Sequence, residues 1–180
     1  MPGRVSFWKG HAIAIEAMSY LKEKISKDFE LICVGPVNNN KLRESLLNKI
    51  KEFKLEDNIR FVGSSKEMNL IYSMADIVLS CATDPEAFGR IPVEAQSMGK
   101  IVIASDHGGH KETISEGVSG FLYAPNKSQD LADAILKALS SEQYLDKSYQ
   151  LKRRNLIIQN YTVEKMCQQT LEVYKKVLSI

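Results

Sequence analysis

Residues 76–104 read DIVLSCATDPEAFGRIPVEAQSMGKIVIA, and this stretch decides the fold. It begins and ends with short apolar runs, 76–80 and 101–104, which are typical of buried parallel strands. Pro92 lies between them and is tolerated in the first turn of a helix but not deeper, which predicts a helix that begins near Ile91. A strand, a loop, a helix and a second strand in this order form one unit of a parallel α/β sheet.

The same alternation of short apolar runs and amphipathic stretches continues on both sides of this unit. The predicted strands are 29–34, 58–62 and 120–123, and the predicted helices are 11–25, 41–54, 66–74, 111–115, 128–139 and, as a polar helical tail, 141–180. Ser128 is the expected N-cap of its helix. Short connections between alternating elements indicate an α/β fold, a Rossmann-like parallel sheet with helices on both faces. Residues 1–180 contain no repeat and no internal linker, so we expect a single domain.

The composition of the chain is ordinary for a globular protein. Hydrophobic residues make up 44% and charged residues 26%, and 24 Lys and Arg against 22 Asp and Glu leave a formal net charge of +2. This near balance gives no reason to expect nucleic-acid binding, which needs a concentrated basic face. No apolar run reaches the roughly 18 residues of a membrane span, and the first residues lack the apolar core of a signal peptide. We therefore expect a cytoplasmic protein with free thiols at Cys33, Cys81 and Cys167.

The loop after the strand at 76–80 carries the strongest functional signal, because ligands of open parallel sheets bind at the carboxyl ends of the strands. It holds Glu86 and leads to Glu94 in the first turn of the predicted helix, so both carboxylates can face one cleft. Backbone N–H groups of 88–90 at the helix N-terminus would bind phosphate, and carboxylates accept hydrogen bonds from sugar hydroxyls. On spacing alone each acid could equally be structural, Glu94 by complementing the helix dipole and Glu86 as a solvated loop residue.

Two other loops contribute weaker signals. Arg4 and Lys9 flank a short loop before the first helix, where two cations would neutralise a pyrophosphate, although both could equally be surface cations. The strand end around Val62 offers backbone groups to a flat base. His107 and His110 either reach toward a ligand or belong to a solvated loop. No set of residues has the spacing of a catalytic triad or of a metal site.

Taken in order, these motifs resemble the C-terminal domain of the retaining glycosyltransferases of family 4, the GT-B "glycosyl transferases group 1" family. The run from Glu86 to Ala104 matches the family's E-x7-E segment and the strand that follows it, and residues 3–10 match its G-R-x4-K-G. Residues 117–122 resemble its G-x-x-G-x-L strand. The resemblance covers the chain from about Gly3 to its end. It implies the nucleotide-sugar-binding half of a GT-B fold, without the N-terminal domain that binds the acceptor.

The resemblance also implies a role for each candidate residue. Arg4 and Lys9 would hold the diphosphate of the donor, and Glu86 would contact the transferred sugar; these three are the expected catalytic residues. Glu94 would hold the ribose hydroxyls, and Val62 would meet the base. The donor site is completed by Phe88, Gly89, Arg90 and Ile91, the first three through backbone amides. No metal or other cofactor is expected, and the donor would be a nucleoside-diphosphate sugar of the UDP or GDP type.

The implied function is transfer of a hexose, with retention at the anomeric carbon, to a glycan or lipid-linked acceptor in cell-envelope polysaccharide biosynthesis. Because Gly3-Arg4 follows the start at once, the sequence opens at the end of a strand. We therefore expect either a domain cut from a longer enzyme or a gene remnant, which binds a nucleotide or nucleotide sugar weakly and transfers no sugar alone. Further partners that the sequence leaves open are the inner face of the membrane and a second copy of the chain. The rival hypothesis is a non-catalytic Rossmann-like interaction module.

Overall fold

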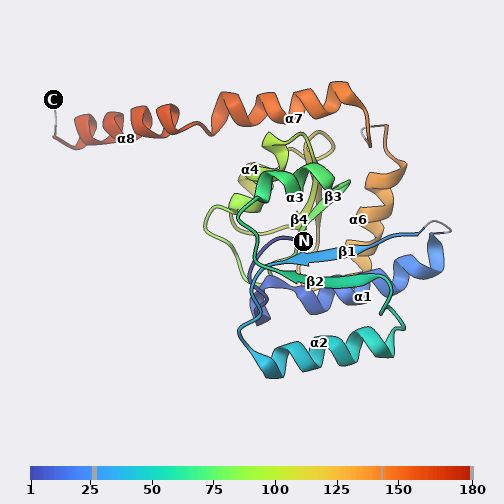
Figure 1. The fold of residues 1–180 in the computed structure, drawn as a ribbon. Helices are drawn as coiled ribbons and strands as arrows, with labels where there is room; N and C mark the ends of the chain where they lie inside the picture. The colour runs from blue at the N-terminus through green and yellow to red at the C-terminus, as the bar shows by residue number, and fades with distance from the viewer. Residues whose placement is uncertain (26–27, 143, 179–180) are drawn as a thin grey trace.

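The computed structural model describes the chain apart from residues 26–27, 143 and 179–180 (Figure 1). Its strands are β1 (Leu31–Val34), β2 (Ile59–Gly63), β3 (Ile77–Ser80), β4 (Ile101–Ser105) and β5 (Gly120–Tyr123). Its helices are the 3-10 turn η1 (Phe7–Lys9) and α1 (His11–Lys24), α2 (Asn40–Glu52), α3 (Met68–Met74), α4 (Arg90–Ser97), α5 (His110–Thr113), α6 (Ser128–Ser140), α7 (Lys147–Asn160) and α8 (Val163–Leu178). The predicted alternation of strands and helices is confirmed.

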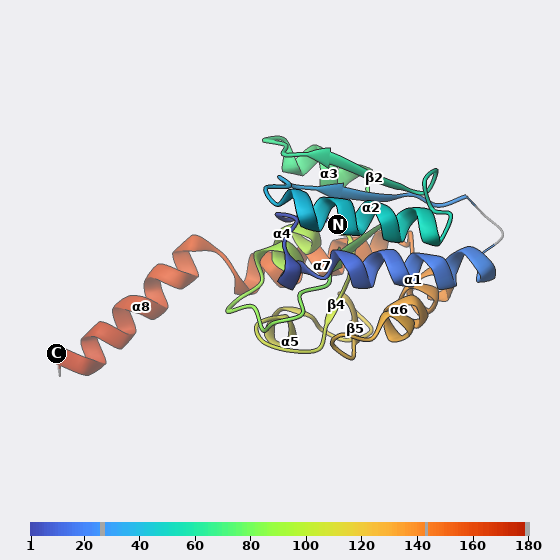
Figure 2. The same ribbon diagram turned by 90° about the horizontal axis from the view of Figure 1, so that it is seen from below.

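The strands form two parallel sheets, where the sequence suggested one. β1 pairs with β2, and β4 lies between β3 and β5. The chain before η1 runs between the two sheets (Figures 1 and 2), where Pro2 and Val5 make isolated parallel bridges to Val34 and Val37. Since these are single bridges, the first residues complete a Rossmann-like layer without forming a regular central strand.

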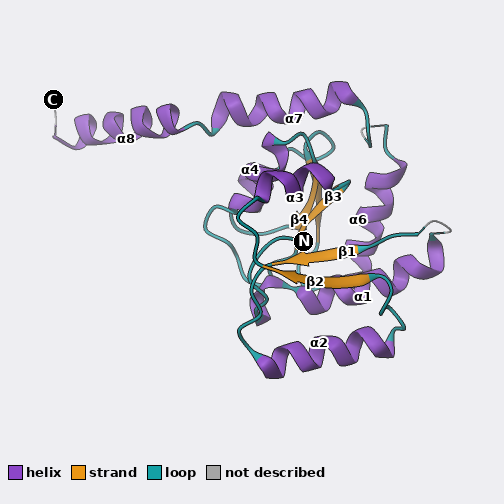
Figure 3. Cartoon of the chain, viewed as in Figure 1, coloured by secondary structure: helices purple, strands orange, loops and turns teal. Residues whose placement is uncertain are grey.

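Helices cover both faces of this layer, as predicted (Figure 3). β4 is buried along its whole length, and its side chains alternate between two cores. Ile101 and Ile103 belong to the larger core, which includes side chains of α1, α2 and α6. Val102 and Ala104 belong to a smaller core with side chains of α3 and α4. The sheet is therefore buried on both faces, and a polar ligand can bind only at the ends of its strands.

Two helix starts differ from their predictions. α4 begins at Arg90 after Gly89, whose φ of 78° lies in the left-handed region that favours glycine. Glu94 is consequently the fifth residue of α4. The sequence predicted it in the first turn, but it lies just beyond that turn. Lys127, not Ser128, is the N-cap of α6, and no side chain caps this helix.

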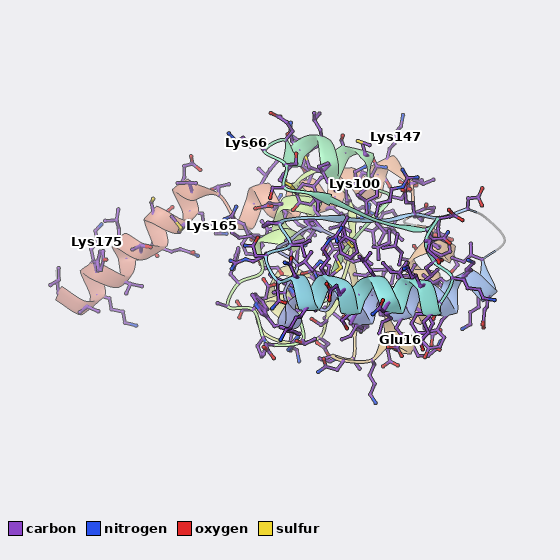
Figure 4. The ribbon with its side chains drawn as sticks, turned by 60° about the horizontal axis from the view of Figure 1, so that its bottom comes forward. Glu16, Lys66, Lys100, Lys147, Lys165 and Lys175 are labelled. Carbon is purple, nitrogen blue, oxygen red and sulfur yellow. The ribbon has the colours of Figure 1, made fainter. Side chains whose placement is uncertain are left out.

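The tail is helical, as predicted, but it is not uniformly polar. α7 packs on α4, whereas α8 has no buried residue and projects away from the body (Figures 1 and 2). Lys165 and Lys175 mark its course in Figure 4. One side of α8 is apolar, with Met166, Leu171 and Tyr174 each more than half exposed. None of the described helices has the length and apolar character needed to cross a membrane.

The cysteines differ in their surroundings. Cys33 on β1 and Cys81 directly after β3 are buried, whereas Cys167 is exposed on α8. All three are free thiols. Burial raises the pKa of the Cys33 thiol to about 11 and that of the Cys81 thiol to about 12.

Candidate functional site

The loop between β3 and α4 meets η1 through an ion pair between two predicted site residues. Lys9 and Glu86, which are 77 positions apart, form this pair, and their side chains are only 17% and 11% exposed. The ammonium group of Lys9 also lies 4.2 Å from the centroid of the Trp8 ring. A partly buried pair is screened less by water than a surface pair. The Lys9–Glu86 pair places one positive and one negative group side by side at the carboxyl end of the sheet.

Close backbone packing holds η1 against the start of this loop. The backbone N–H of Thr83 donates to the carbonyl oxygen of Trp8 at 2.7 Å. A side chain at Gly10 would collide with the backbone carbonyl of Cys81, and the φ of Gly10 is 72°. Glycine is therefore required there for both space and conformation, and this requirement positions Lys9 beside Glu86.

The N-terminus of α4 is open to an anion. Its N-cap, Gly89, supplies no side chain to the backbone N–H groups of the first turn. Ile91 in this turn lies beside Gly3, because a Cβ placed on Gly3 would be 3.6 Å from Ile91 Cδ1 and 3.8 Å from Lys9 Cδ. Gly3, the first turn of α4 and the Lys9 side chain thus border one small area. Such an area, with a helix dipole and a cation, suits a phosphate group.

Glu94 is held from two sides. The hydroxyl of Tyr72 on α3 donates to Glu94 Oε2 at 2.8 Å, and the Arg90 guanidinium donates to Glu94 Oε1 at 2.9 and 3.1 Å. Tyr72 is 3% exposed, and burial, together with the neighbouring Glu94 carboxylate, raises the pKa of its hydroxyl. The Arg90 side chain is 85% exposed. Buried Tyr72 therefore fixes the carboxylate, whereas Arg90 pairs with it through an exposed side chain.

A second loop, between β4 and α5, packs against the Glu86 loop and supports it. The backbone N–H of Gly109 donates to the carbonyl oxygen of Glu86 at 2.8 Å. A Cβ on Gly109 would lie within 2.5 Å of the backbone of Phe88, and one on Gly108 would lie 2.5 Å from the carbonyl oxygen of Glu86. The two loops are therefore packed backbone to backbone, which leaves little freedom in the position of Glu86.

His107 and His110 belong to this support and follow neither of the two alternatives that the sequence left open. His110 is fully buried, and its Nδ1 lies 3.0 Å from the carbonyl oxygen of Ser105, which can only accept. Nδ1 therefore carries the proton, and Nε2 accepts from the Ser80 hydroxyl at 3.0 Å. Burial lowers the pKa of His110 and keeps the ring neutral. His107 Nε2 donates to the carbonyl oxygen of Ala82 at 2.8 Å.

Arg4 and Val62 are the predicted residues that the structure does not join to this cluster. Arg4 is exposed and forms no ion pair with any described residue. Val62 is 51% exposed near the end of β2. The backbone nevertheless connects the two ends of the site. Gly35 donates to the carbonyl oxygen of Gly63 at 2.8 Å and packs directly on Gly3, so Val62 lies along the same edge as Ile91.

The candidate residues, from exposed Arg4, Val62 and Phe88 to the partly buried Lys9 and Glu86, form a shelf. They line neither of two hollows in the surface of the described residues. One hollow lies near Gly99 and Arg153, and the other lies between β5 and α6. Phe88 on the shelf is 41% exposed. Among the described residues no group of three or more His, Cys, Asp or Glu side chains gathers that could hold a metal ion. The independence from metal therefore stays a prediction.

The comparison with protein families uses nearly the whole chain. Residues 1–163 match the sequence profile of the family described as Glycosyl transferases group 1. The chain belongs to this family. The predicted group 1 family is thereby confirmed, and the matched region includes η1, the Glu86 loop and α4 but ends where α8 begins.

Three relatives of this group 1 chain extend the comparison. It is 28% identical over 96% of its length to a lipopolysaccharide 1,2-N-acetylglucosaminetransferase of Salmonella typhimurium. A crystal structure of a glycosyltransferase from Rickettsia africae matches 99% of the chain with a TM-score of 0.88 and 34% identity. The Anabaena HepE structure in complex with UDP and glucose matches 97% with a TM-score of 0.86 and 30% identity. The chain spans 46–47% of each relative, about half of its length. The fold matches that of C-terminal GT-B domains, as predicted.

Sequence reasoning missed Tyr72 and the paired glycines Gly108 and Gly109 as parts of the site, and it singled out His110 without its supporting role. Tyr72 gave only a weak signal, since an aromatic residue near the end of a predicted helix is usually part of the core. The Gly108-Gly109 pair was a stronger signal, because adjacent glycines permit close approach of another backbone. The sequence did not show that the backbone approaching these glycines is that of Glu86 and Phe88.

His11, the first residue of α1, makes the stability of this domain depend on pH. The ring is 2% exposed and stacks on Phe61, and neither nitrogen has a hydrogen-bond partner among the described residues. Burial, with smaller effects of the N-terminal ammonium group and Lys9, lowers the pKa of His11 from 6.5 to about 4. Between these two pH values the unfolded chain binds more protons than the folded chain. The free energy of unfolding therefore falls as the pH falls through this window.

We expect His11 to contribute about 3 kcal/mol to this loss. Urea unfolding of the wild type and of His11→Leu, measured across the window, tests the expectation. The quantity to compare is the difference between the two proteins, because contributions that both proteins share cancel in it. This difference should change by about 3 kcal/mol in favour of the variant as the pH falls. Parallel curves for the two proteins would contradict the assignment.

Proposed function

We propose that residues 1–180 bind a nucleoside-diphosphate sugar and form the donor half of a retaining family 4 glycosyltransferase. The observation that carries this proposal is the Lys9–Glu86 pair beside the uncapped N-terminus of α4. A cation and free amides suit a diphosphate, and a carboxylate next to them suits the hydroxyls of the attached sugar. Membership of the group 1 family supports the same assignment.

Lys9 and Glu86 exchange partners when the donor binds. The diphosphate takes over the Lys9 ammonium group, which leaves the Glu86 carboxylate available to accept hydrogen bonds from the sugar. As the bond between the anomeric carbon and the phosphate oxygen breaks, negative charge develops on the leaving diphosphate. Lys9, the α4 amides and the exposed cation Arg4 stabilise that charge. The main-chain amides of Phe88, Gly89 and Arg90 lie at the same helix end.

Glu94 recognises the ribose in this proposal. Each carboxylate oxygen can accept more than one hydrogen bond, so the bonds from Tyr72 and Arg90 leave room for the two ribose hydroxyls. Tyr72 spares the ligand the cost of ordering this side chain. The base would lie near Val62, farther along the glycine-lined edge that begins at Gly3.

The acceptor is the part of the reaction that these residues leave open. Because the relatives are about twice as long, we propose that a second half of the protein binds a glycan or lipid-linked acceptor. Residues 1–180 alone should then bind the donor without transferring sugar. The HepE structure with UDP and glucose supports a UDP sugar as the first donor to test, with GDP sugars as the second.

The test of donor binding is thermal unfolding in the presence of UDP, GDP and ADP. A ligand that binds only the folded chain stabilises it by about 2.7 kcal/mol at 100 times its dissociation constant. At least one of these nucleotides should therefore raise the melting temperature. If none does so at millimolar concentration, the donor-binding proposal fails.

Glu94→Ala is expected to weaken binding of the stabilising nucleotide about tenfold or more, since the ribose loses hydrogen bonds to a charged acceptor. Glu44→Ala on α2, where the side chain is exposed, is the matched control and should bind like the wild type. Calorimetric titration of both variants measures the effect. Equal affinities for the two variants would remove Glu94 from the ribose site.

A non-catalytic interaction module remains the second candidate, and the observation that favours it is the uncovered apolar side of α8. Such a module would need no nucleotide. A flat response to all three nucleotides, together with a stable complex formed through α8, would favour it over donor binding.

A further inference from the structure

Tyr161 joins three elements at the point where α8 leaves the body of the protein. Its backbone N–H donates to the carbonyl oxygen of Ile157 at 2.8 Å and closes the end of α7. Its hydroxyl donates to the carbonyl oxygen of Glu112 on α5 at 2.8 Å. Its ring meets the Phe88 ring edge-on, with centroids 5.6 Å apart and an interplanar angle of 62°. One side chain therefore bonds to α5 and contacts the loop that carries Glu86.

The position of Tyr161 is fixed by α7. Arg153 in this helix is 1% exposed, and its guanidinium group donates to the carbonyl oxygens of Gly99 and Val118 at 2.9 and 3.2 Å. Ile157, one turn before Tyr161, is also buried. Beyond Tyr161, no described residue forms a hydrogen bond, ion pair or ring contact with the chain before α7. Tyr161 is thus the last anchored residue of the tail.

Phe88 is the part of the Glu86 loop that Tyr161 touches. Its backbone packs on Gly109, and its ring, 41% exposed, has Tyr161 as its aromatic neighbour. Phe88 lies between Glu86 and Gly89, so the position of its ring bears on the sugar end of the proposed donor site. Glu94 at the ribose end is held separately by Tyr72 and Arg90.

We propose that Tyr161 is a positioning residue for the sugar end of the donor site, which it holds through Phe88. This inference rests on the proposed function. Because the ribose end is held by other residues, loss of the Tyr161 ring should weaken binding of a nucleoside-diphosphate sugar more than binding of the nucleoside diphosphate. A merely structural residue would weaken both ligands alike.

Trp8 supplies the signal for the test. It is the only tryptophan of the chain, it is 40% exposed, and the ammonium group of Lys9 lies over its ring. Its fluorescence should respond when a diphosphate takes over Lys9. Titrations with UDP and UDP-glucose, and in parallel with GDP and GDP-mannose, give the affinity ratio of sugar nucleotide to nucleotide for each protein.

In Tyr161→Ala this ratio should fall about two- to tenfold, which corresponds to loss of an aromatic pair, while the affinity for the nucleotide alone stays within about twofold. Tyr161→Phe keeps the ring and should retain most of the ratio. Tyr174→Ala removes an exposed tyrosine of α8 and is the matched control without effect. If Tyr161→Ala does not fold, Tyr161→Leu, which keeps apolar volume but no ring, carries the same expectation.

The outcomes separate the two proposals. An unchanged ratio in a folded Tyr161→Ala or Tyr161→Leu protein, or an equal loss for both ligands, overturns the role of Tyr161 alone. A wild-type chain that binds none of the four ligands overturns the proposed function and this inference together. A reduced ratio in Tyr161→Ala that is restored in Tyr161→Phe supports the inference.

Discussion

Lys9→Met is expected to reduce the affinity for a nucleoside-diphosphate sugar by about 10- to 100-fold. The substitution keeps most of the apolar stem of the side chain and removes its charge. The diphosphate then loses a charge-assisted hydrogen bond, which contributes about 1.5–3 kcal/mol. Glu86, with its side chain only 11% exposed, also loses its partner and repels the incoming diphosphate.

Calorimetric titration with the stabilising nucleotide and with its sugar derivative measures this loss. Lys49→Met is the matched control, since Lys49 of α2 pairs with Glu16 of α1 at 3.4 Å and both side chains are about one-third exposed. Glu16 is labelled in Figure 4 on its helix. This control should bind like the wild type. If Lys9→Met also does so, the diphosphate lies elsewhere.

Gly109→Ala is expected to destabilise the fold by about 1–3 kcal/mol and to weaken donor binding at least tenfold. The φ of Gly109 is −62° and its ψ is −13°, a conformation that alanine adopts readily. The new Cβ would nevertheless lie within 2.5 Å of the backbone of Phe88. Because this contact is between the backbones of the two loops, no side chain can move aside, and the Glu86 loop has to shift.

Gly117→Ala provides the opposite control. The φ of Gly117 is 73°, so alanine there is strained by roughly 1 kcal/mol, yet a Cβ would meet nothing within 4 Å. This variant should lose stability and keep its donor affinity. Chemical unfolding and ligand titration of both variants distinguish a displaced loop from a strained backbone. Matching donor affinities would mean that Gly109 does not position the Glu86 loop.

The order of elements could be predicted because local features determine it. Pro92 limits how far a helix can extend before it, and four- or five-residue apolar runs mark the buried strands. The exact start of α4 depends on Gly89 and its φ of 78°, which the sequence does not reveal. That one-residue difference was enough to move Glu94 out of the first turn.

The site could be predicted only as separate parts. The loops with Lys9 and Glu86 were both identified, but their contact joins positions 77 residues apart. Spacing along the chain says nothing about such a contact. The same limit applied to Tyr72 on α3, whose hydroxyl donates to Glu94 on α4. For α8, the sequence indicates a helix with charged and apolar residues, and the structure adds its course: the helix projects from the body, so its apolar side is uncovered.

The contrast between the three cysteines allows one of them, Cys167, to be labelled selectively. The thiolate is the reactive form, and burial keeps Cys33 and Cys81 protonated at neutral pH. Cys167 stands in solvent midway along α8. A thiol-directed dye or spin label would therefore attach at one place in the folded molecule without any substitution. That place is on α8, which projects from the body, so a label there would report directly when another surface covers this helix.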